Sequence, residues 1–501
     1  MYTTAISVLL GAFVAVPATQ AGDLGWGACP GAERPEDLRC ASVEVPLDWA
    51  EPDGRTITLR IAKLPATGRG GGTVFSIPGG PGGSGIDDLS YSTKSFAKLR
   101  ERFDVVSFEP RNATSFGRLP VECFATGPWL TRPGSRAEYR RLGATVRASA
   151  QECRKRDPEF FDHLDSASVA RDIDAIRAAL GEERLSFIAT SYGGVPAVAY
   201  ARLFPQRIRA MYLDGAVNQL RDAATDARVR YRTYEAQFGR FVEWCAASKA
   251  CGEDVGGRWR KLVAAADRTP IPVKELTAPG PGKDEPGPEK PGAGMSEPGA
   301  GKGEEVAYSG FDLQVAAMPN LVGPGPAPGY PRWRQLAQAI RQAEAGDAAG
   351  FARYVQAGVG SLKPPSFVGM NATMCADGLR FGDYREYRAV RAMGERVSPN
   401  LAGMGLWHRL GCVGRPGSVR NPSAPLPSAG LPPFLGAGSW TDYDDSADIV
   451  RRVPGSGTVR FDGHGHGLYL TGNACAIAHA NAYLTDLRLP APGTVCHPAQ
   501  P

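Results

Sequence analysis

The chain has 501 residues, of which 43% are hydrophobic and 22% charged, and its formal net charge is +5. This length exceeds one ordinary domain, so we expect a large folded core that carries a sizeable insertion. Basic and acidic residues are interspersed without a basic block, which excludes the electrostatic footprint of a nucleic-acid-binding protein.

The N-terminal segment has the pattern of a secretory signal peptide. Residues 5–16 are apolar but too few to span a bilayer, and small residues follow up to Ala21. A buried N-terminal strand or helix is the alternative. We therefore expect residues 1–21 to be removed and the protein to be secreted. No later apolar run is long enough to cross a bilayer, so we expect no integral membrane span in the mature protein. We also expect a monomer.

The ten cysteines fit an exported protein. No two of them form a Cys-x-x-Cys pair, so we expect neither a metal site nor a redox dithiol, and no cofactor. Sequence does not fix connectivity, but pairing in sequence order would give five local disulfides. These hypothetical pairs are Cys29–Cys40, Cys123–Cys153, Cys245–Cys251, Cys375–Cys412 and Cys475–Cys496.

The first third of the chain alternates strand-like and helix-like segments. The predicted strands are residues 55–61, 73–77, 103–108, 185–189 and 208–213. Between the third and fourth of these, apolar residues recur at helical spacing from Val169 to Leu180, and Gly181 follows as a stop signal. Strands that alternate with helices indicate a mostly parallel sheet covered by helices on both faces.

This alternation is interrupted in the middle of the chain. Residues 219–264 and 332–397 predict helices, whereas residues 278–303 are rich in Pro, Gly and charge and have few apolar side chains to bury. Strand-like sequence returns at 431–435 and 458–461. We therefore expect a core formed by residues 22–218 and 426–501, interrupted by a helical lid at 219–425 that contains a disordered segment at 278–303.

A serine lies at the bend between the strand at 185–189 and the next helix. The sequence Ala189-Thr190-Ser191-Tyr192-Gly193 is close to G-x-S-x-G, with alanine in place of the first glycine. In a nucleophile elbow, small residues at both ends let the strand and helix pack closely while the hydroxyl projects above the sheet. A serine that caps a helix is the alternative. Ser191 is the candidate nucleophile.

A serine nucleophile needs an imidazole base and an acid that orients the base. His464 and His466 follow the strand at 458–461, and we expect His466 to be the base, with a metal-binding pair as the alternative. Asp442, Asp444 and Asp445 follow the preceding strand, and we expect Asp442 to be the acid because the other two could cap the next helix. The order Ser, Asp, His is that of the α/β-hydrolase fold.

The glycine-rich sequence IPGGPGGSG at 77–85 follows the strand at 73–77. Glycines let the backbone approach a substrate and direct amide hydrogens at a developing negative charge. We expect the N–H groups of Gly80 and Tyr192 to stabilise the oxyanion. Phosphate binding is the alternative, but no Lys-Ser or Lys-Thr follows, as a P-loop requires.

Together these motifs resemble one family. IPGGPGGSG, FDVVSFEPRNATS, SVARDIDAIRAALGEERLSFIATSYGG and FDGHGHG are similar to the secreted tripeptidyl aminopeptidases of actinobacteria, which are relatives of the proline iminopeptidases. The resemblance covers about residues 25–220 and 370–496. It implies an α/β-hydrolase with a lid that releases short peptides or amino acids from peptide N-termini through an acyl-enzyme on Ser191. It also implies that His466 is the base and that Gly80 and Tyr192 are the oxyanion donors.

The acid is where the chain departs from this family. The family pattern is Gly-x-x-Asp-Pro, whereas this chain reads Gly438-Ser439-Trp440-Thr441-Asp442. Strict spacing places Thr441 at the acid, and a shift of one residue places Asp442 there. Two other functions stay open. One is a carboxylesterase or lipase that uses the same triad on small esters, and the other is a catalytically silent secreted binding protein.

Overall fold

The computed structural model describes residues 24–31, 34–120, 123, 132–274, 307–322, 331–351, 371–402 and 406–498. The expected signal peptide at 1–21 and the expected disordered segment at 278–303 lie outside these ranges.

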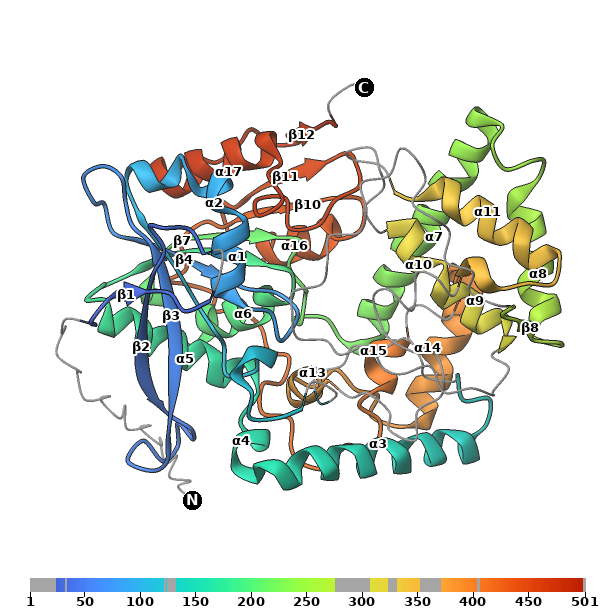
Figure 1. The fold of residues 1–501 in the computed structure, drawn as a ribbon, viewed down its shortest axis with the longest axis horizontal. Coiled ribbons are helices and arrows are strands. Elements are labelled where there is room, and N and C mark those ends of the chain that lie inside the picture. Colours follow the sequence, from blue (N-terminus) through green and yellow to red (C-terminus); the bar gives the residue numbers. More distant parts are fainter. Residues whose placement is uncertain are drawn as a thin grey trace, which may run out of the picture.

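A ten-stranded sheet forms the centre of the described structure, in the order β1-β2-β3-β5-β4-β6-β7-β10-β11-β12 (Figure 1). The strands are β1 (Gly27–Ala28), β2 (Arg39–Pro46), β3 (Thr56–Leu64), β4 (Thr73–Ile77), β5 (Asp104–Phe108), β6 (Leu185–Thr190), β7 (Ile208–Asp214), β10 (Leu435–Gly438), β11 (Gly457–Phe461) and β12 (Val495–Cys496). The β1–β2, β2–β3 and β3–β5 pairs are antiparallel, and all other neighbours are parallel. The predicted mostly parallel sheet is confirmed.

Buried side chains of the sheet alternate between its two faces, as the period of a strand requires. Phe75 and Phe187 belong to one apolar cluster, and their chain neighbours Val74 and Ile188 belong to another. Helices α5 (Ser166–Ala179), α6 (Gly194–Leu203) and α16 (Tyr443–Val450) pack in the first cluster, and α1 (Gly85–Tyr91), α2 (Thr93–Phe96) and α17 (Ala474–Asp486) in the second. The sheet is therefore covered on both faces, as predicted (Figure 1).

One predicted strand begins later than expected. The sequence predicts a strand at 431–435, but β10 starts only at Leu435, which pairs with Tyr212 of β7. Pro432 and Pro433 precede it. Because proline has no N–H to donate to a ladder, these two residues cannot pair as central-strand residues do.

Between β7 and β10 the described residues are mostly helical and lie beside the sheet (Figure 1). The helices are α7 (Ala223–Ser248), α8 (Val255–Ala266), α9 (Gly310–Ala316), α10 (Met318–Val322), α11 (Trp333–Glu344), α13 (Ala372–Ala376), α14 (Tyr384–Val397) and α15 (Trp407–Leu410), and β8 (Ile271–Pro272) pairs with β9 (Ala307–Tyr308). A separate apolar cluster includes Trp259 and Ile340. We refer to residues 219–425 as the lid. No helix in the described part of the chain is both long and apolar enough to cross a membrane.

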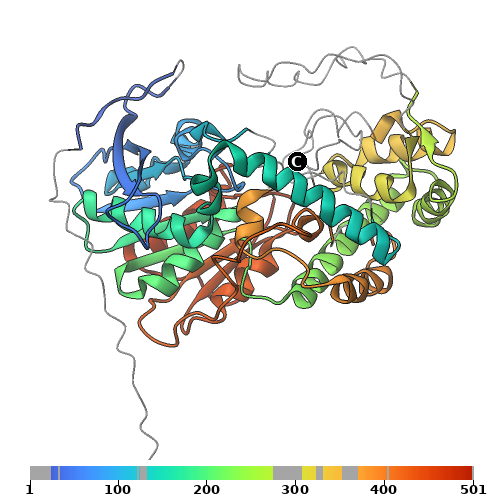
Figure 2. The same cartoon turned by 90° about the horizontal axis from the view of Figure 1, so that it is seen from below.

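A long helix from the first part of the chain also reaches the lid (Figure 2). Helix α3 (Arg136–Arg156) is followed by α4 (Pro158–Asp162). Tyr139 of α3 stacks on Tyr387 of α14 with 5.3 Å between ring centroids, and the Tyr387 hydroxyl donates to the Pro133 carbonyl at 2.7 Å. The lid is thus anchored to a segment that precedes β6 in the sequence.

All ten cysteines lie in the described structure and form five disulfides, with none free. The pairs are Cys29–Cys40, Cys123–Cys153, Cys245–Cys251, Cys375–Cys412 and Cys475–Cys496, which is the pairing in sequence order. Each disulfide therefore closes a local loop within the core or within the lid.

Candidate active site

Ser191 directly follows β6 at a sharp turn, where it adopts a φ of +56°. A left-handed conformation is strained for a residue with a Cβ. The short 3-10 turn Ser191–Gly193 then leads into α6. A Cβ on Gly193 would lie 2.5 Å from the Ile77 carbonyl oxygen, and one on Gly194 would lie 2.5 Å from the Ala216 Cβ. Only glycine fits at both positions, so this turn has the close strand–helix packing of a nucleophile elbow.

The His466 ring is hydrogen-bonded to Asp442. Its Nδ1 lies 2.6 Å from Oδ2 of Asp442. Because a carboxylate accepts, Nδ1 donates and Nε2 is left to take a proton. The other oxygen of Asp442 accepts from the Ser439 N–H at 2.6 Å, which fixes the carboxylate. A Cβ on Gly215 would lie 2.6 Å from Oδ2 of Asp442 and 3.2 Å from Nδ1 of His466, so a glycine here makes room for the pair.

The carboxylate changes the basicity of the ring. Partial burial alone would lower the pKa of His466, but the hydrogen bond to Asp442 and the charges of Asp442 and Asp214 outweigh it. The pKa of His466 therefore lies above its ordinary value of 6.5. The same interactions stabilise the imidazolium that forms when the ring takes a proton.

The alternative candidates are placed differently. His464 is buried, and desolvation lowers its pKa despite the nearby charge of Asp442. Asp444 is exposed, and Asp445 forms an ion pair with Arg221. The hydroxyl of Thr441 lies 3.0 Å from that of Ser439. Of the acids that the sequence left open, Asp442 is the one beside His466.

The described residues show no hydrogen bond between the Ser191 hydroxyl and the His466 ring. The segments that carry them are nevertheless in contact, because a Cβ on Gly467 would lie 3.0 Å from Cγ2 of Thr190. Each contact residue is the immediate neighbour of a candidate catalytic residue. Catalytic hydrogen bonds are often long without substrate and shorten when it binds.

The glycine-rich loop after β4 lies against Ser191. A Cβ on Gly79 would lie 2.8 Å from the Ser191 Cβ and 3.4 Å from its Oγ. Gly80 has a φ of +113°, and its N–H donates no hydrogen bond to any described residue. Tyr192, the other expected oxyanion donor, is the residue after Ser191. The loop ends where Ser84 caps α1 by accepting the N–H of Asp87 at 3.0 Å.

No sequence motif singles out Asp214 as a site residue. This carboxylate ends β7, is fully buried, and accepts the N–H of Tyr469 at 2.7 Å. Burial raises its pKa to about 6, and the charge of Asp442 adds to this effect, whereas the hydrogen bond from Tyr469 opposes it. Because Tyr469 is three residues after His466, Asp214 helps to hold the histidine loop. An acid that closes an otherwise apolar buried strand was the signal available in the sequence.

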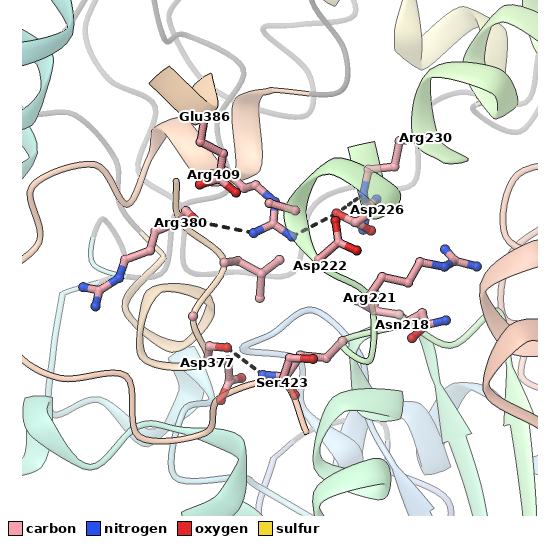
Figure 3. A pocket seen from close by; sticks show the side chains of 15 residues that line it. Asn218, Arg221, Asp222, Asp226, Arg230, Asp377, Arg380, Glu386, Arg409 and Ser423 are labelled. Atoms are coloured by element: carbon pink, nitrogen blue, oxygen red, sulfur yellow. Dashed lines mark hydrogen bonds and ion pairs between the residues drawn. The ribbon is translucent and has the colours of Figure 1, made fainter. Parts of the chain in front are cut away.

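A cavity of about 230 Å³ is lined mostly by lid residues, with Val217 and Asn218 of the core completing its wall (Figure 3). Val217 lines it, and the Val217 N–H donates to the carbonyl of Ser191 at 2.9 Å. Charges of both signs surround the cavity. Figure 3 shows Arg409 bridging Asp226, at 3.3 Å, and the carbonyl of Arg380.

One cluster in the described structure has metal-ligand residue types, namely Cys475, His479 and Cys496. Its two cysteines form a disulfide with each other and offer no thiolate. This donor set therefore does not fit a zinc site.

Family models match both parts of the core. A model described as "alpha/beta hydrolase fold" matches residues 72–252, and a model described as "TAP-like protein" matches residues 400–496. The first range contains the Ser191 elbow, and the second contains Asp442 and His466.

Curated relatives include both peptidases and an esterase. The tripeptidyl aminopeptidase of Streptomyces lividans is 27% identical, over 97% of this chain and 89% of that protein. The serine protease Hip1 of Mycobacterium bovis is 34% identical, over 45% of this chain and 46% of that protein. The carboxylesterase B of Mycobacterium tuberculosis is 26% identical, over 92% of this chain and 86% of that protein. With the fold and the arrangement at the ends of β6, β10 and β11, these matches show that the chain is a serine hydrolase of the tripeptidyl aminopeptidase-like α/β-hydrolase family.

Proposed function

We propose that this protein is an aminopeptidase that releases short peptides or amino acids from peptide N-termini through an acyl-enzyme on Ser191. The observation that carries the proposal is the 2.6 Å bond between His466 and Asp442, on loops adjoining a nucleophile elbow. The tripeptidyl aminopeptidase relative, aligned over 97% of the chain, supports the choice of substrate.

In the proposed reaction, Nε2 of His466 takes the proton of Ser191 as its Oγ attacks the scissile carbonyl carbon. The N–H groups of Gly80 and Tyr192 stabilise the oxyanion. The imidazolium, held by Asp442, then gives its proton to the leaving amine and the tetrahedral intermediate collapses to the acyl-enzyme. Water, activated by the same imidazole, attacks the ester and releases the N-terminal product.

A carboxylesterase is the second candidate, because ester and amide cleavage share the tetrahedral intermediate and because one relative aligned over 92% of the chain is a carboxylesterase. Tripeptidyl and aminoacyl p-nitroanilides, compared with short p-nitrophenyl esters, separate the two. We expect the anilides with a free N-terminus to be cleaved, and N-acetylation of them to abolish cleavage. Hydrolysis of the esters alone would assign the protein as an esterase, and the Ser191→Ala variant controls for contaminating enzymes.

We also propose that the protein is exported. Five disulfides support this, because disulfides persist in oxidising compartments. When it is expressed in a host with residues 1–21 included, the protein should appear outside the cytoplasm with its N-terminus near Gly22. An uncleaved N-terminus on cytoplasmic protein would contradict export.

A further inference from the structure

A buried carboxylate of the lid contacts the residue next to the nucleophile. Asp377 follows α13 and is 1% exposed. Its Oδ1 accepts from the N–H of Ser166 at 2.8 Å and from Nδ2 of Asn421 at 3.1 Å. Its Oδ2 accepts from the hydroxyl of Ser166 at 2.6 Å and from the hydroxyl of Tyr192 at 2.7 Å. Four donors therefore fix this carboxylate, and one of them is the side chain of an expected oxyanion donor.

The Tyr192 side chain is buried against both the core and the lid. It is 2% exposed and packs with Val195 of α6 and with Met374 and Leu379 of the lid. Both lid residues lie within three positions of Asp377. The ring is thus clamped by apolar contacts on its sides and by a hydrogen bond at its tip, and the lid supplies part of each.

The two ends of the lid meet at the same place. Nε2 of Gln219, at the start of the lid, donates to the carbonyls of Asp377 and Asn421, each at 2.6 Å. Asn421, near the end of the lid, also accepts from Arg202 of α6. Figure 3 shows Asp377 at the edge of the cavity nearest the core. Hydrogen bonds at Asp377 therefore connect both ends of the lid to each other and, through Asn421, to α6.

This arrangement has a cost that apolar packing would avoid. Asp377 forms no ion pair with a described residue, and burial raises its pKa to about 7 against the opposing hydrogen bonds from Ser166. The charge of Asp165 also raises the pKa of Asp377, and the charge of Asp377 in turn acts to raise the pKa values of Arg202 and Arg415. A buried carboxyl group is expensive, and hydrogen bonds rather than a counter-charge compensate it here.

We propose that Asp377 is a positioning residue for the oxyanion site: through the Tyr192 hydroxyl it fixes the peptide that carries the Tyr192 N–H beside Ser191. The lid and the nucleophile elbow are thereby coupled. The proposal rests on the proposed function, because the position of this N–H matters only to a reaction that forms an oxyanion. Asp377 itself contacts neither substrate nor the reacting atoms. Small displacements of a preorganised donor weaken transition-state stabilisation.

The test is a double-mutant cycle of Tyr192→Phe and Asp377→Asn, with kcat and KM measured on a tripeptidyl p-nitroanilide. Tyr192→Phe keeps the ring and the backbone N–H and removes only the hydroxyl. We expect each variant to lose about tenfold in kcat with KM changed less than twofold, and the double variant to lose no more than about tenfold. Such non-additivity is expected only if the two side chains act through one contact.

Tyr200→Phe is the matched control. Tyr200 is a buried tyrosine of α6 whose hydroxyl donates to Asp174 at 3.2 Å, so this variant also loses a buried tyrosine–aspartate bond. We expect its thermal stability to fall while kcat stays within twofold of wild type. Wild-type kcat in both Tyr192→Phe and Asp377→Asn, or losses that multiply to about a hundredfold, would overturn the positioning role alone. A wild-type protein that hydrolyses neither anilides nor esters would overturn it together with the proposed function.

Discussion

Ser191 lies in a turn that is packed so closely that neither Gly79 nor Gly193 has space for a Cβ. His466, in contrast, lies on a loop and its side chain is 55% exposed. The proposed nucleophile is held by close packing against residues of its own turn and of the loop after the adjacent strand. The proposed base, His466, is held directly by Asp442, and Asp214 holds the same loop through the N–H of Tyr469. These two carboxylates lie at the ends of different strands.

The lid contributes to the two regions in different ways. On the side of His466, Trp440, two residues before Asp442, stacks on Trp333 of α11 with an interplanar angle of 3°. The carbonyl of Trp440 also accepts a hydrogen bond from Gln237 of α7 at 3.0 Å. On the nucleophile side, the lid reaches the elbow through Asp377. The comparison teaches that close packing determines the turn that carries Ser191, and that the lid adds one hydrogen bond there, between Asp377 and Tyr192. His466, in contrast, is positioned by hydrogen bonds to carboxylates.

Variants of the two histidines should have the largest effects, and they test whether His466 is the base. We expect His466→Ala to lower kcat by about 10⁴-fold or more, because the serine loses its base. His464→Ala is the control, since His464 is two residues away on the same loop, and it should change kcat by less than about tenfold. Steady-state kinetics on the anilide substrate measures both. A larger loss of kcat in the His464 variant would show that His464, and not His466, is the base.

The acid is the next test. We expect Asp442→Asn to lower kcat by about 10³- to 10⁴-fold with the fold intact, because the amide favours the wrong tautomer of His466. Asp444→Asn changes an exposed carboxylate two residues away and should leave kcat near that of wild type. Circular dichroism controls for folding. If Asp444→Asn has the larger effect, the hydrogen bond of Asp442 is structural only.

The steric side is tested by glycines. A Cβ on Gly193 would meet the Ile77 carbonyl at 2.5 Å, so Gly193→Ala should destabilise the protein by about 1–3 kcal/mol. Gly239 lies within α7 with nothing near its missing Cβ, and Gly239→Ala should instead stabilise by about 0.5–1 kcal/mol. Denaturant unfolding gives both values. Equal changes in the free energy of unfolding for the two substitutions would contradict the claim that close packing at Gly193 shapes the turn.

The smallest effect concerns pH. Only neutral His466 can act as a base, and its pKa lies above 6.5, so kcat/KM should rise with pH through a midpoint above 6.5. Because the hydrogen bond and charge of Asp442 raise this pKa, Asp442→Asn should move the midpoint of the His466 NMR titration to lower pH. Asp214→Asn should move it in the same direction but less. An unchanged midpoint in Asp442→Asn would show that the pair is not coupled.

The sequence allowed the elbow to be predicted but left the acid ambiguous. Ser191 could be located because its turn is built from neighbours in the chain, where small residues at fixed spacing signal close packing. Asp442 could not be separated from Thr441 by spacing, because its place depends on the Ser439 amide and on Trp440 stacking against the lid. Asp377 could not be found at all, since its partners lie 44 to 211 residues away.

The central claim is that Ser191 is an activated nucleophile, and labelling with a fluorophosphonate tests it most directly. We predict rapid, stoichiometric modification mapped to Ser191 by peptide mass spectrometry, with labelling absent in Ser191→Ala and strongly slowed in His466→Ala. Folded wild-type protein that stays unlabelled, or that is labelled equally fast without His466, would contradict the account and favour a silent binding protein on the same fold.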